Sequence, residues 1–494
     1  MSCRVISQKA AVSVVYAGAM FMAVMDQTIV NVALIAIGRQ FHTPATAVAG
    51  AVIAYQVSVA LSIPAAAWLG DRIGPRQLLL GSIAVFTVAS ALCGLAGSLD
   101  QLVAFRVLQG VGGGLMTPAG LTMLFRAFPL AERVRASAIL VIPTALAPAV
   151  GPVIGGLFVT DISWRWVFYV NVPVGLLALV FGVLFLADQD HPAAGRFDVA
   201  GFVTSSLGLG LLMYGVSEGP SAGWTDGPIV ACIAAGALLL AAMVVIELRA
   251  TAPLLDLRVY ADRLFRSASV VLTLTSVAFF GLIFLLSLFF QNGLHFSALQ
   301  AGSAICPEAF GVIIASQLIS RRIYPAVGPR RIMVAGLLLI AAIAVILSLA
   351  GTGTSVWLLR VILFVMGFGV AAVFLPSQAA GFATVGAART SVASTIFSAQ
   401  RMIGGAIGVV LLTAVITALH PVRAVAGGAE ANIAAFHDGL LVCAGVAVAA
   451  ALAALTVRDA DAAATMVRHR RQSPADAAVE TVLPAEGAPA ASTD

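Results

Sequence analysis

Long apolar segments separated by short polar loops run along most of this chain. Each segment reaches about twenty residues, the length at which an α-helix crosses the hydrocarbon core of a bilayer. Because these runs are continuous and do not alternate with polar positions, they exclude the strands of a membrane β-barrel. The pattern predicts an all-α polytopic membrane protein with about fourteen transmembrane helices, near residues 11–36, 46–69, 77–96, 101–125, 137–160, 171–186, 199–216, 228–248, 267–290, 299–319, 332–350, 356–382, 392–419 and 436–457.

The composition supports a membrane protein. The chain of 494 residues is 61% hydrophobic and 10% charged, with a mean hydropathy of +1.04, whereas about a quarter of the residues in a soluble domain are charged. The net charge of +5 is spread over loops, so it forms no basic patch for a nucleic acid. The five cysteines stand apart, without the spacing of a metal site or a disulfide framework.

Basic residues are concentrated in every second loop. The richer set of loops includes Lys9, Arg72, Arg76, Arg126, Arg133, Arg135, Arg196, Arg249, Arg258, Arg321, Arg330 and Arg389. The opposite set holds only Arg39, Arg165 and Arg423. Since cytoplasmic loops carry the excess of Lys and Arg, both termini are predicted to be cytoplasmic in a multi-pass cell-membrane protein. Residues 458–494, rich in Ala, Pro, Glu and Asp, are predicted to form a disordered tail.

The first and last parts of the chain resemble each other. Arg106 is followed by glycines and Pro118, and Arg360 is followed by glycines and Pro376. The loop from Gly70 (GDRIGPR) has a counterpart in RRIYPAVGPRR at 321–331. We therefore expect two pseudo-symmetric six-helix bundles, 1–186 and 267–457, with an inserted helix pair in 187–266. Such repeats are typical of transporters, whose binding site lies between the halves near the midplane.

Asp26 and Arg106 are charged residues inside apolar helices. A charge at this depth costs on the order of 3 kcal/mol, so each should face a partner or a wet cavity. Asp26 lies roughly 22 Å from the cytoplasmic end of its helix, and Arg106 roughly 8 Å from the outer end of its helix. In a core about 30 Å thick, these depths nearly coincide. We hypothesise that Arg106 influences Asp26, which takes up and releases a proton; a fixed structural ion pair is the alternative.

Five further polar residues are candidates for a substrate cavity: Glu308, Asn31, Gln56, Gln109 and Arg401. Glu308 would contact a cationic substrate or serve as a second proton site, or it is a protonated carboxyl group that hydrogen-bonds within the bundle. Asn31, Gln56 and Gln109 would hydrogen-bond a substrate or join helices. For Arg401, a structural pairing with an acid or with backbone carbonyls is the favoured expectation.

The segment 143–157 (PTALAPAVGPVIGGL) combines prolines with small residues on one helix face. Ala147, Gly151 and Gly155 recur every fourth residue, which lets a second backbone approach closely. Prolines bend the helix where neighbours satisfy the freed carbonyls. The glycine spacing alone is equally typical of an ordinary helix–helix contact.

The short loop at 70–76 is predicted to act as a gating latch that holds the outward-facing state. Its candidate residues are Gly70, Asp71, Arg72, Gly74 and Arg76. Gly74 can adopt a positive φ in a tight turn, and Asp71 can cap a helix or pair with a basic residue. A purely topological role would explain the arginines but leaves Asp71 unexplained.

Five segments in order resemble the major facilitator superfamily and, within it, the fourteen-helix drug:proton antiporter family. They are 26–34 (DQTIVNVAL), 69–76 (LGDRIGPR), 106–114 (RVLQGVGGG), 143–157 and 164–175 (WRWVFYVNVPVG). The loop departs from the family pattern at Ala67 and Pro75. The resemblance identifies an antiporter motif, which marks exporters, in Pro148, Gly151, Pro152, Gly155 and Gly156.

The resemblance implies a proton-coupled exporter of hydrophobic or cationic drugs or toxic compounds across the cytoplasmic membrane. An exporter of an endogenous lipid or secondary metabolite, or a facilitator of the same fold, is the alternative. No catalytic or metal-binding constellation predicts an enzyme, and no G-x-x-x-x-G-K-[ST] motif predicts ATP binding. We thus expect no cofactor, a proton gradient as the energy source, and an amphipathic small molecule, protons and the bilayer as partners; an adaptor protein is left open.

Overall fold

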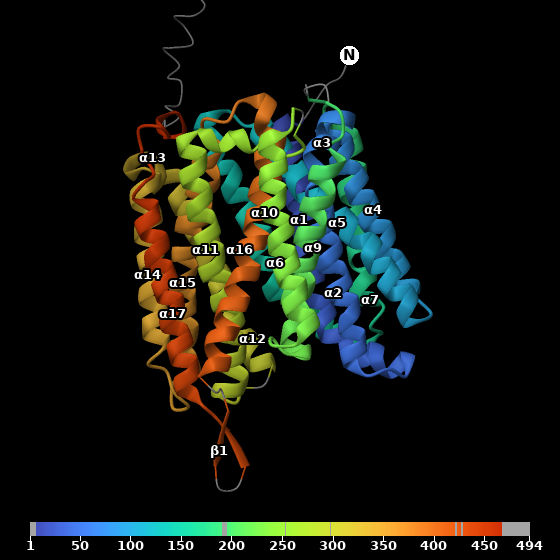
Figure 1. The fold of residues 1–494 in the computed structure, drawn as a ribbon, viewed down its shortest axis with the longest axis vertical. Helices are drawn as coiled ribbons and strands as arrows, with labels where there is room; N and C mark the ends of the chain where they lie inside the picture. The colour runs from blue at the N-terminus through green and yellow to red at the C-terminus, as the bar shows by residue number, and fades with distance from the viewer. Residues whose placement is uncertain are drawn as a thin grey trace, which may run out of the picture.

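The computed structural model describes residues 6–189, 195–251, 253–296, 298–419, 422–425 and 428–466. Its described part is almost entirely α-helical (Figure 1). The first half contains α1 (Gln8–Phe41), α2 (Ala45–Ser62), α3 (Ala65–Ile73), α4 (Pro75–Leu95), α5 (Leu99–Ala127), α6 (Arg133–Asp161), α7 (Trp166–Tyr169) and α8 (Asn171–Phe185). Next come α9 (Val199–Ala222) and α10 (Gly227–Arg249). The second half contains α11 (Arg263–Leu288), α12 (Ala298–Leu318), α13 (Tyr324–Val327), α14 (Pro329–Leu347), α15 (Val356–Gly381), α16 (Thr390–Ala418) and α17 (Ile433–Ala454).

Twelve helices of the described chain are long and apolar enough to cross a membrane. The pair α2 and α3 makes a thirteenth span, broken at Pro64 and bent by 59°. The predicted helix at 46–69 is therefore kinked. The number of about fourteen is not confirmed by this test. The long helix that fails this test is α5. It is 29 residues long, but Arg106, Gln109 and several glycines lower its mean hydropathy.

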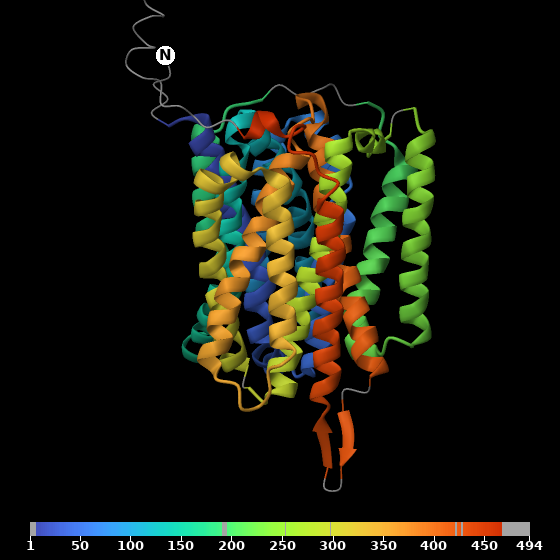
Figure 2. The ribbon, with the colours of Figure 1, turned by 90° about the vertical axis from the view of Figure 1, so that its left-hand side faces the viewer.

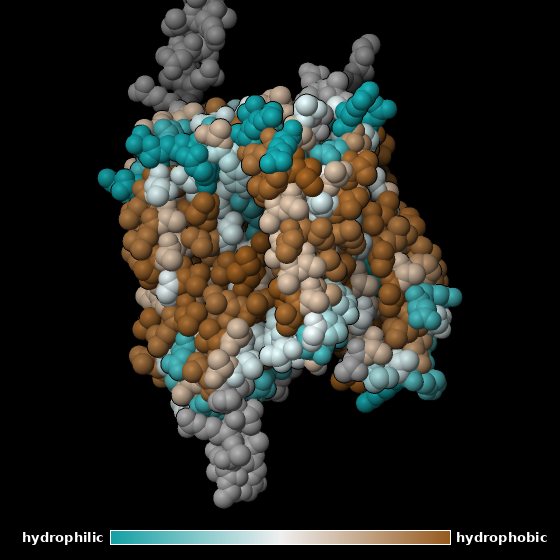
Figure 3. Space-filling view, viewed as in Figure 1, coloured by the Kyte–Doolittle hydropathy of each residue, from teal (hydrophilic) through white to brown (hydrophobic). Residues whose placement is uncertain are grey.

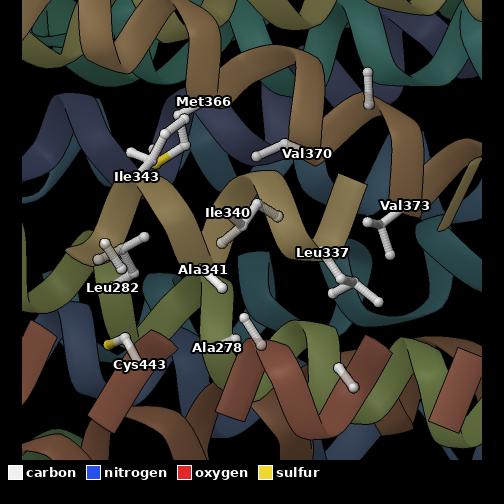
Figure 4. Packing of buried hydrophobic residues seen from close by; sticks show 14 of the residues in the cluster. Ala278, Leu282, Leu337, Ile340, Ala341, Ile343, Met366, Val370, Val373 and Cys443 are labelled. Atoms are coloured by element: carbon white, nitrogen blue, oxygen red, sulfur yellow. The ribbon is translucent and has the colours of Figure 1, made fainter. Parts of the chain in front are cut away.

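The two halves repeat the same packing. In the first half, α1 packs on α6 and α5 packs on both α2 and α4; in the second, α11 packs on α16 and α15 packs on both α12 and α14. α8 and α17 each contact the first and third long helices of their own half. In the core of the second half, Leu337 and Ile340 of α14 lie between Val370 of α15 and Ala278 of α11 (Figure 4).

The inserted helices α9 and α10 stand at one side of the bundle (Figure 2). α9 packs on α2 of the first half and on α16 of the second, whereas α10 packs mainly on α9. The apolar side chains Leu238, Val244 and Leu248 of α10 are exposed. Figure 3 shows a broad hydrophobic band between two hydrophilic ends of the molecule.

The two ends of the bundle differ. One, here called the basic end, carries the α3–α4 connection with Arg72 and Arg76 and the segment from the end of α12 to the start of α14 with Arg321, Arg322 and Arg330. Figure 1 places the N-terminal side of α1 and α13 at this end. At the opposite end, here called the hairpin end, β1 (Val422–Val425) and β2 (Gly428–Ala431) form an antiparallel hairpin.

Part of the predicted tail is folded against the basic end. The hydroxyl groups of Tyr324 and Thr465 lie 2.8 Å apart, and the Arg330 backbone N–H donates to Asp459 at 2.9 Å. The folded region thus extends through Met466, beyond the boundary expected at residue 457. The remainder of the predicted tail, 467–494, lies outside the described residues.

Candidate functional site

Asp26 of α1 and Arg106 of α5 form an ion pair at the centre of the first half. Both side chains are fully buried. The structure thus brings into contact two residues whose depths in the membrane were expected to coincide. Because a buried charge is costly without a partner, each residue makes the burial of the other tolerable.

The ion pair lies within a polar network that joins five helices, α1, α2, α4, α5 and α8. Asp26 accepts hydrogen bonds at Oδ1 from Gln109 Nε2 at 2.9 Å and from Asn171 Nδ2 at 3.3 Å. Arg106 also donates to Gln109 Oε1 at 2.8 Å, and its guanidinium carbon lies 4.2 Å from the centre of the Tyr55 ring. These donors match an ionised carboxylate, which can only accept hydrogen bonds.

The network contains residues that sequence reasoning did not select. Ser90 Oγ of α4 accepts from both Gln109, at 3.3 Å, and Asn171, at 3.2 Å. Asn171 lies in the 164–175 motif. A lone amide in an apolar segment could have identified it as a candidate. Ser90 and Tyr55 gave no such signal, since a serine or tyrosine in a membrane helix is common. Addition of a proton to Asp26 would remove the counter-charge of Arg106 and weaken the contacts among α1, α5 and α8.

Two of the predicted cavity residues instead join helices. Gln109 is fully buried in the network around Asp26. Gln56 of α2 accepts a hydrogen bond from Ser217 Oγ of α9 at 2.9 Å, which ties the inserted pair to the first half. The sequence left two roles open for these residues, a hydrogen bond to a substrate and the joining of helices. In this structure both residues join helices.

Asn31 lies on a face of α1 whose exposure changes along the helix. Tyr16 and Met20, near the basic end, are 1% and 4% exposed, whereas Gln27 and Asn31 are exposed and Ile35 is 62% exposed. At three or four residues apart, these side chains share one face. On this face Tyr16 and Met20 contact Thr117 of α5, and α1 also packs on α2, α6 and α8. The shared face is therefore covered at the basic end and open toward the hairpin end.

Aromatic residues join the two halves at the basic end. Phe125 of α5 stacks on Phe382, which follows α15, with ring centres 4.3 Å apart, and Phe382 contacts Phe397 of α16 at 5.1 Å. Arg133 of α6 donates a hydrogen bond to the backbone oxygen of Phe382. Arg126 donates to Ser391 of α16 at 3.1 Å. These contacts close the seam between the halves at this end.

The segment 70–76, predicted to be a loop, is the last turn of α3, Gly74 and the start of α4, and it contributes to this closure through Asp71. Asp71 Oδ1 accepts a hydrogen bond from Ser391 Oγ of the second half at 3.0 Å. Gly74 has a φ of 91°, a conformation that favours glycine. Arg72 is exposed, and Arg76 pairs with Asp188, which follows α8, at 3.4 Å. Asp71 therefore contacts the second half across the seam, whereas Arg72 and Arg76 make no such contact among the described residues.

The small residues of the 143–157 segment lie against α1. A Cβ atom on Gly151 would overlap Thr28 Oγ1, and one on Gly155 would lie 2.8 Å from Ile29 Cγ1. Gly156 has no such neighbour within 4 Å, and Pro148 is exposed. Pro152 lies within α6. Close contact is thus confined to Gly151 and Gly155, next to the turn of α1 that carries Asp26.

Glu308 and Arg401 have no partner in the part of the chain that the structure describes. Glu308 of α12 is 8% exposed and lies on the helix face opposite the exposed Phe310 and Ile314. Arg401 of α16 is partly exposed. The expected pairing of Arg401 with an acid or a backbone carbonyl is absent among the described residues, whereas Arg360 donates to Ser303 at 3.2 Å.

Comparisons with known proteins agree on one family. The model of the Major Facilitator Superfamily matches residues 16–409. The chain is 34% identical over 413 residues to the multidrug resistance protein B homolog of Mycobacterium tuberculosis, covering 80% of this chain and 74% of that protein. It is 33% identical over 397 residues to the tetracenomycin C resistance and export protein of Streptomyces glaucescens, covering 79% and 73%. The solved structure of the human organic anion transporter MFSD10 (TETRAN) aligns with a TM-score of 0.65 at 15% identity, over 91% of this chain and 100% of that chain, which indicates a shared fold.

Proposed function

This chain belongs to the Major Facilitator Superfamily, and we propose that it is a proton-coupled antiporter that exports hydrophobic or cationic drugs or toxic compounds across the cytoplasmic membrane. The observation that carries the proposal is the buried Asp26–Arg106 pair, a titratable group inside a membrane bundle. Export, rather than uptake, is supported by relatives that are named for multidrug resistance and for tetracenomycin C export.

In this proposal, the basic end faces the cytoplasm, as the excess of arginines at that end supports. The closed seam at the basic end and the exposed face of α1 toward the hairpin end then correspond to an outward-facing state. A proton from outside reaches Asp26 in this state. Protonation weakens the bonds from Arg106, Gln109 and Asn171 and shifts the population toward the inward-facing state.

The packing of α6 on α1 links this proton step to the movement of the halves. Gly151 and Gly155 hold the Thr28–Ile29 segment close, only two to three residues from Asp26. α6 also contacts α12 and α15 of the second half. A change at Asp26 is therefore transmitted through α1 and α6 to the seam.

Proton-driven transport in inverted membrane vesicles tests the proposal. We expect an imposed pH gradient, acidic inside, to drive uptake of a fluorescent lipophilic cation, and Asp26→Asn to abolish the gradient-driven part. Asp100→Asn, an exposed acid in the first turn of α5, is the matched control and should leave uptake unchanged. Full coupling in Asp26→Asn would refute the role of Asp26.

A second candidate is an exporter of a secondary metabolite made by the cell itself. The similarity to the tetracenomycin C resistance and export protein favours it. The two candidates share the same proton site and differ in substrate range. Uptake of only one among several unrelated compounds by the same vesicles would favour this narrower function, and downhill transport that ignores the pH gradient would indicate a facilitator.

A further inference from the structure

Arg401 is a permanent positive charge deep in the bundle. It lies eleven residues after Thr390, the first residue of α16, which places it about 17 Å along the helix axis. Its side chain is partly exposed, and the described residues offer it no hydrogen bond or ion pair. Because a guanidinium stays ionised and is costly at this depth, a counter-charge from outside the chain would be strongly favoured here.

The position of Arg401 relative to the closed seam is specific. Phe397, four residues earlier on the same helix face, packs against Phe382 in the aromatic closure. Arg401 therefore lies one helical turn from the closure, on the side of the hairpin end. A compound that entered between the halves from the hairpin end would meet this charge just before the closed seam.

Tyr16 of α1 lies in the same apolar cluster as Phe397 and Met402, the neighbours of Arg401 on α16. Its hydroxyl donates to the Thr117 backbone oxygen of α5 at 2.8 Å. Tyr16 is buried and lies at the basic end of the same α1 face that carries the exposed Asn31. Met20 on that face and Met402 beside Arg401 belong to one apolar cluster, and methionines adapt to apolar groups of varied shape.

We propose that Arg401 binds the acidic group of an amphipathic anion, such as a carboxylate on a hydrophobic body, and that the chain prefers such anions to neutral or cationic analogues. The fork of N–H donors on a guanidinium matches a carboxylate in charge and geometry. The apolar part of the compound packs beside Met402, which is partly exposed next to Arg401. The inference rests on the proposed export function but changes its substrate class: hydrophobic acids, rather than cations, become the preferred substrates.

A matched set of probes tests this inference with the full chain in proteoliposomes. The probes are dansylaminoundecanoate, its methyl ester and the corresponding trimethylammonium compound, which share one fluorescent hydrophobic body. We expect the wild type to bind and transport the carboxylate in preference to the ester. Arg401→Gln should reduce this preference about tenfold or more, the scale of one charge-assisted hydrogen bond, and Arg401→Lys should retain much of it.

Arg360→Gln is the control, because Arg360 already has a partner in Ser303 and contacts Trp357; the preference for the carboxylate should not change. An equal loss of all three probes in folded Arg401→Gln, or an unchanged preference, would overturn the inference. Equilibrium binding, followed by dansyl fluorescence in detergent, separates the two proposals. A carboxylate preference in binding that depends on Arg401, without transport driven by a pH gradient, would contradict the antiporter but support the anion site.

Discussion

A Cβ atom on Gly155 of α6 would lie 2.8 Å from Cγ1 of Ile29 and 3.2 Å from its carbonyl oxygen in α1. Gly151, one turn earlier, approaches the Thr28 hydroxyl even more closely. Asp26 lies in the same region of α1. The two glycines therefore set the separation between α6 and the part of α1 that carries the buried carboxylate.

Gly155→Ala should destabilise the protein and slow transport, since an added methyl group must displace the backbone or Ile29. Overpacking of this kind costs about 1–3 kcal/mol. Gly156→Ala is the control, because nothing lies within 4 Å of its Cβ position. Thermal unfolding and transport of both purified variants check the expectation. Equal behaviour of the two variants would show that the close contact at Gly155 is not needed.

Asp26→Asn should destabilise the folded protein because it leaves Arg106 buried without a counter-charge. Loss of one partner of a buried ion pair costs about 3–5 kcal/mol. The double variant Asp26→Asn/Arg106→Gln should recover much of this stability but none of the gradient-driven transport. Unfolding and vesicle assays on the wild type, both single variants and the double variant measure the two effects separately. A double variant as unstable as Asp26→Asn would contradict the assignment of the cost to the unpaired charge.

A disulfide between the halves at the basic end should arrest transport. Asp71 and Ser391 are in hydrogen-bond contact across the seam, at 3.0 Å, so cysteines at these positions should cross-link on mild oxidation. Reduction should restore transport. Arg72→Cys/Ser391→Cys is the control, since Arg72 is exposed and has no contact with Ser391 among the described residues. Unimpeded transport by the fully cross-linked protein would show that this end does not open during the cycle.

Hydropathy was sufficient to predict the helical membrane fold, five motifs in order identified the family, and position along each helix predicted that Asp26 and Arg106 lie at nearly the same depth. Each of these can be read along the sequence one segment at a time. The partners of Gln56 and Asp71, and the lack of a partner for Arg401 among the described residues, depend on how separate helices pack side by side. No single-sequence pattern specifies that Gln56 meets Ser217 of α9, and nothing in the segment around Arg401 indicates that its guanidinium lacks a partner.

Gln56→Ala should lower stability, whereas Asn31→Ala should change substrate preference. Gln56 joins α2 to α9, so its loss should lower the free energy of unfolding by about 1 kcal/mol, the value of one hydrogen bond, and affect all substrates alike. Asn31 is exposed on the open face of α1, so its loss should change the relative transport of different compounds without loss of stability. Unfolding midpoints and a panel of substrates distinguish the two. A change of substrate preference in Gln56→Ala would indicate that Gln56 contacts the substrate.

Glu308→Gln should leave the folded protein at least as stable as the wild type. Glu308 is almost fully buried, and no cation or hydrogen-bond donor pairs with it among the described residues. Its replacement by glutamine therefore breaks no ion pair. The change also removes a carboxyl group that is costly to ionise in an apolar site. If Glu308 contacts cationic substrates, the variant should lose export of a lipophilic cation while it retains export of a neutral compound of the same body. An equal loss of both compounds would exclude a cation contact and indicate a second proton site. A marked fall in stability would instead reveal a structural hydrogen bond made by the protonated carboxyl group.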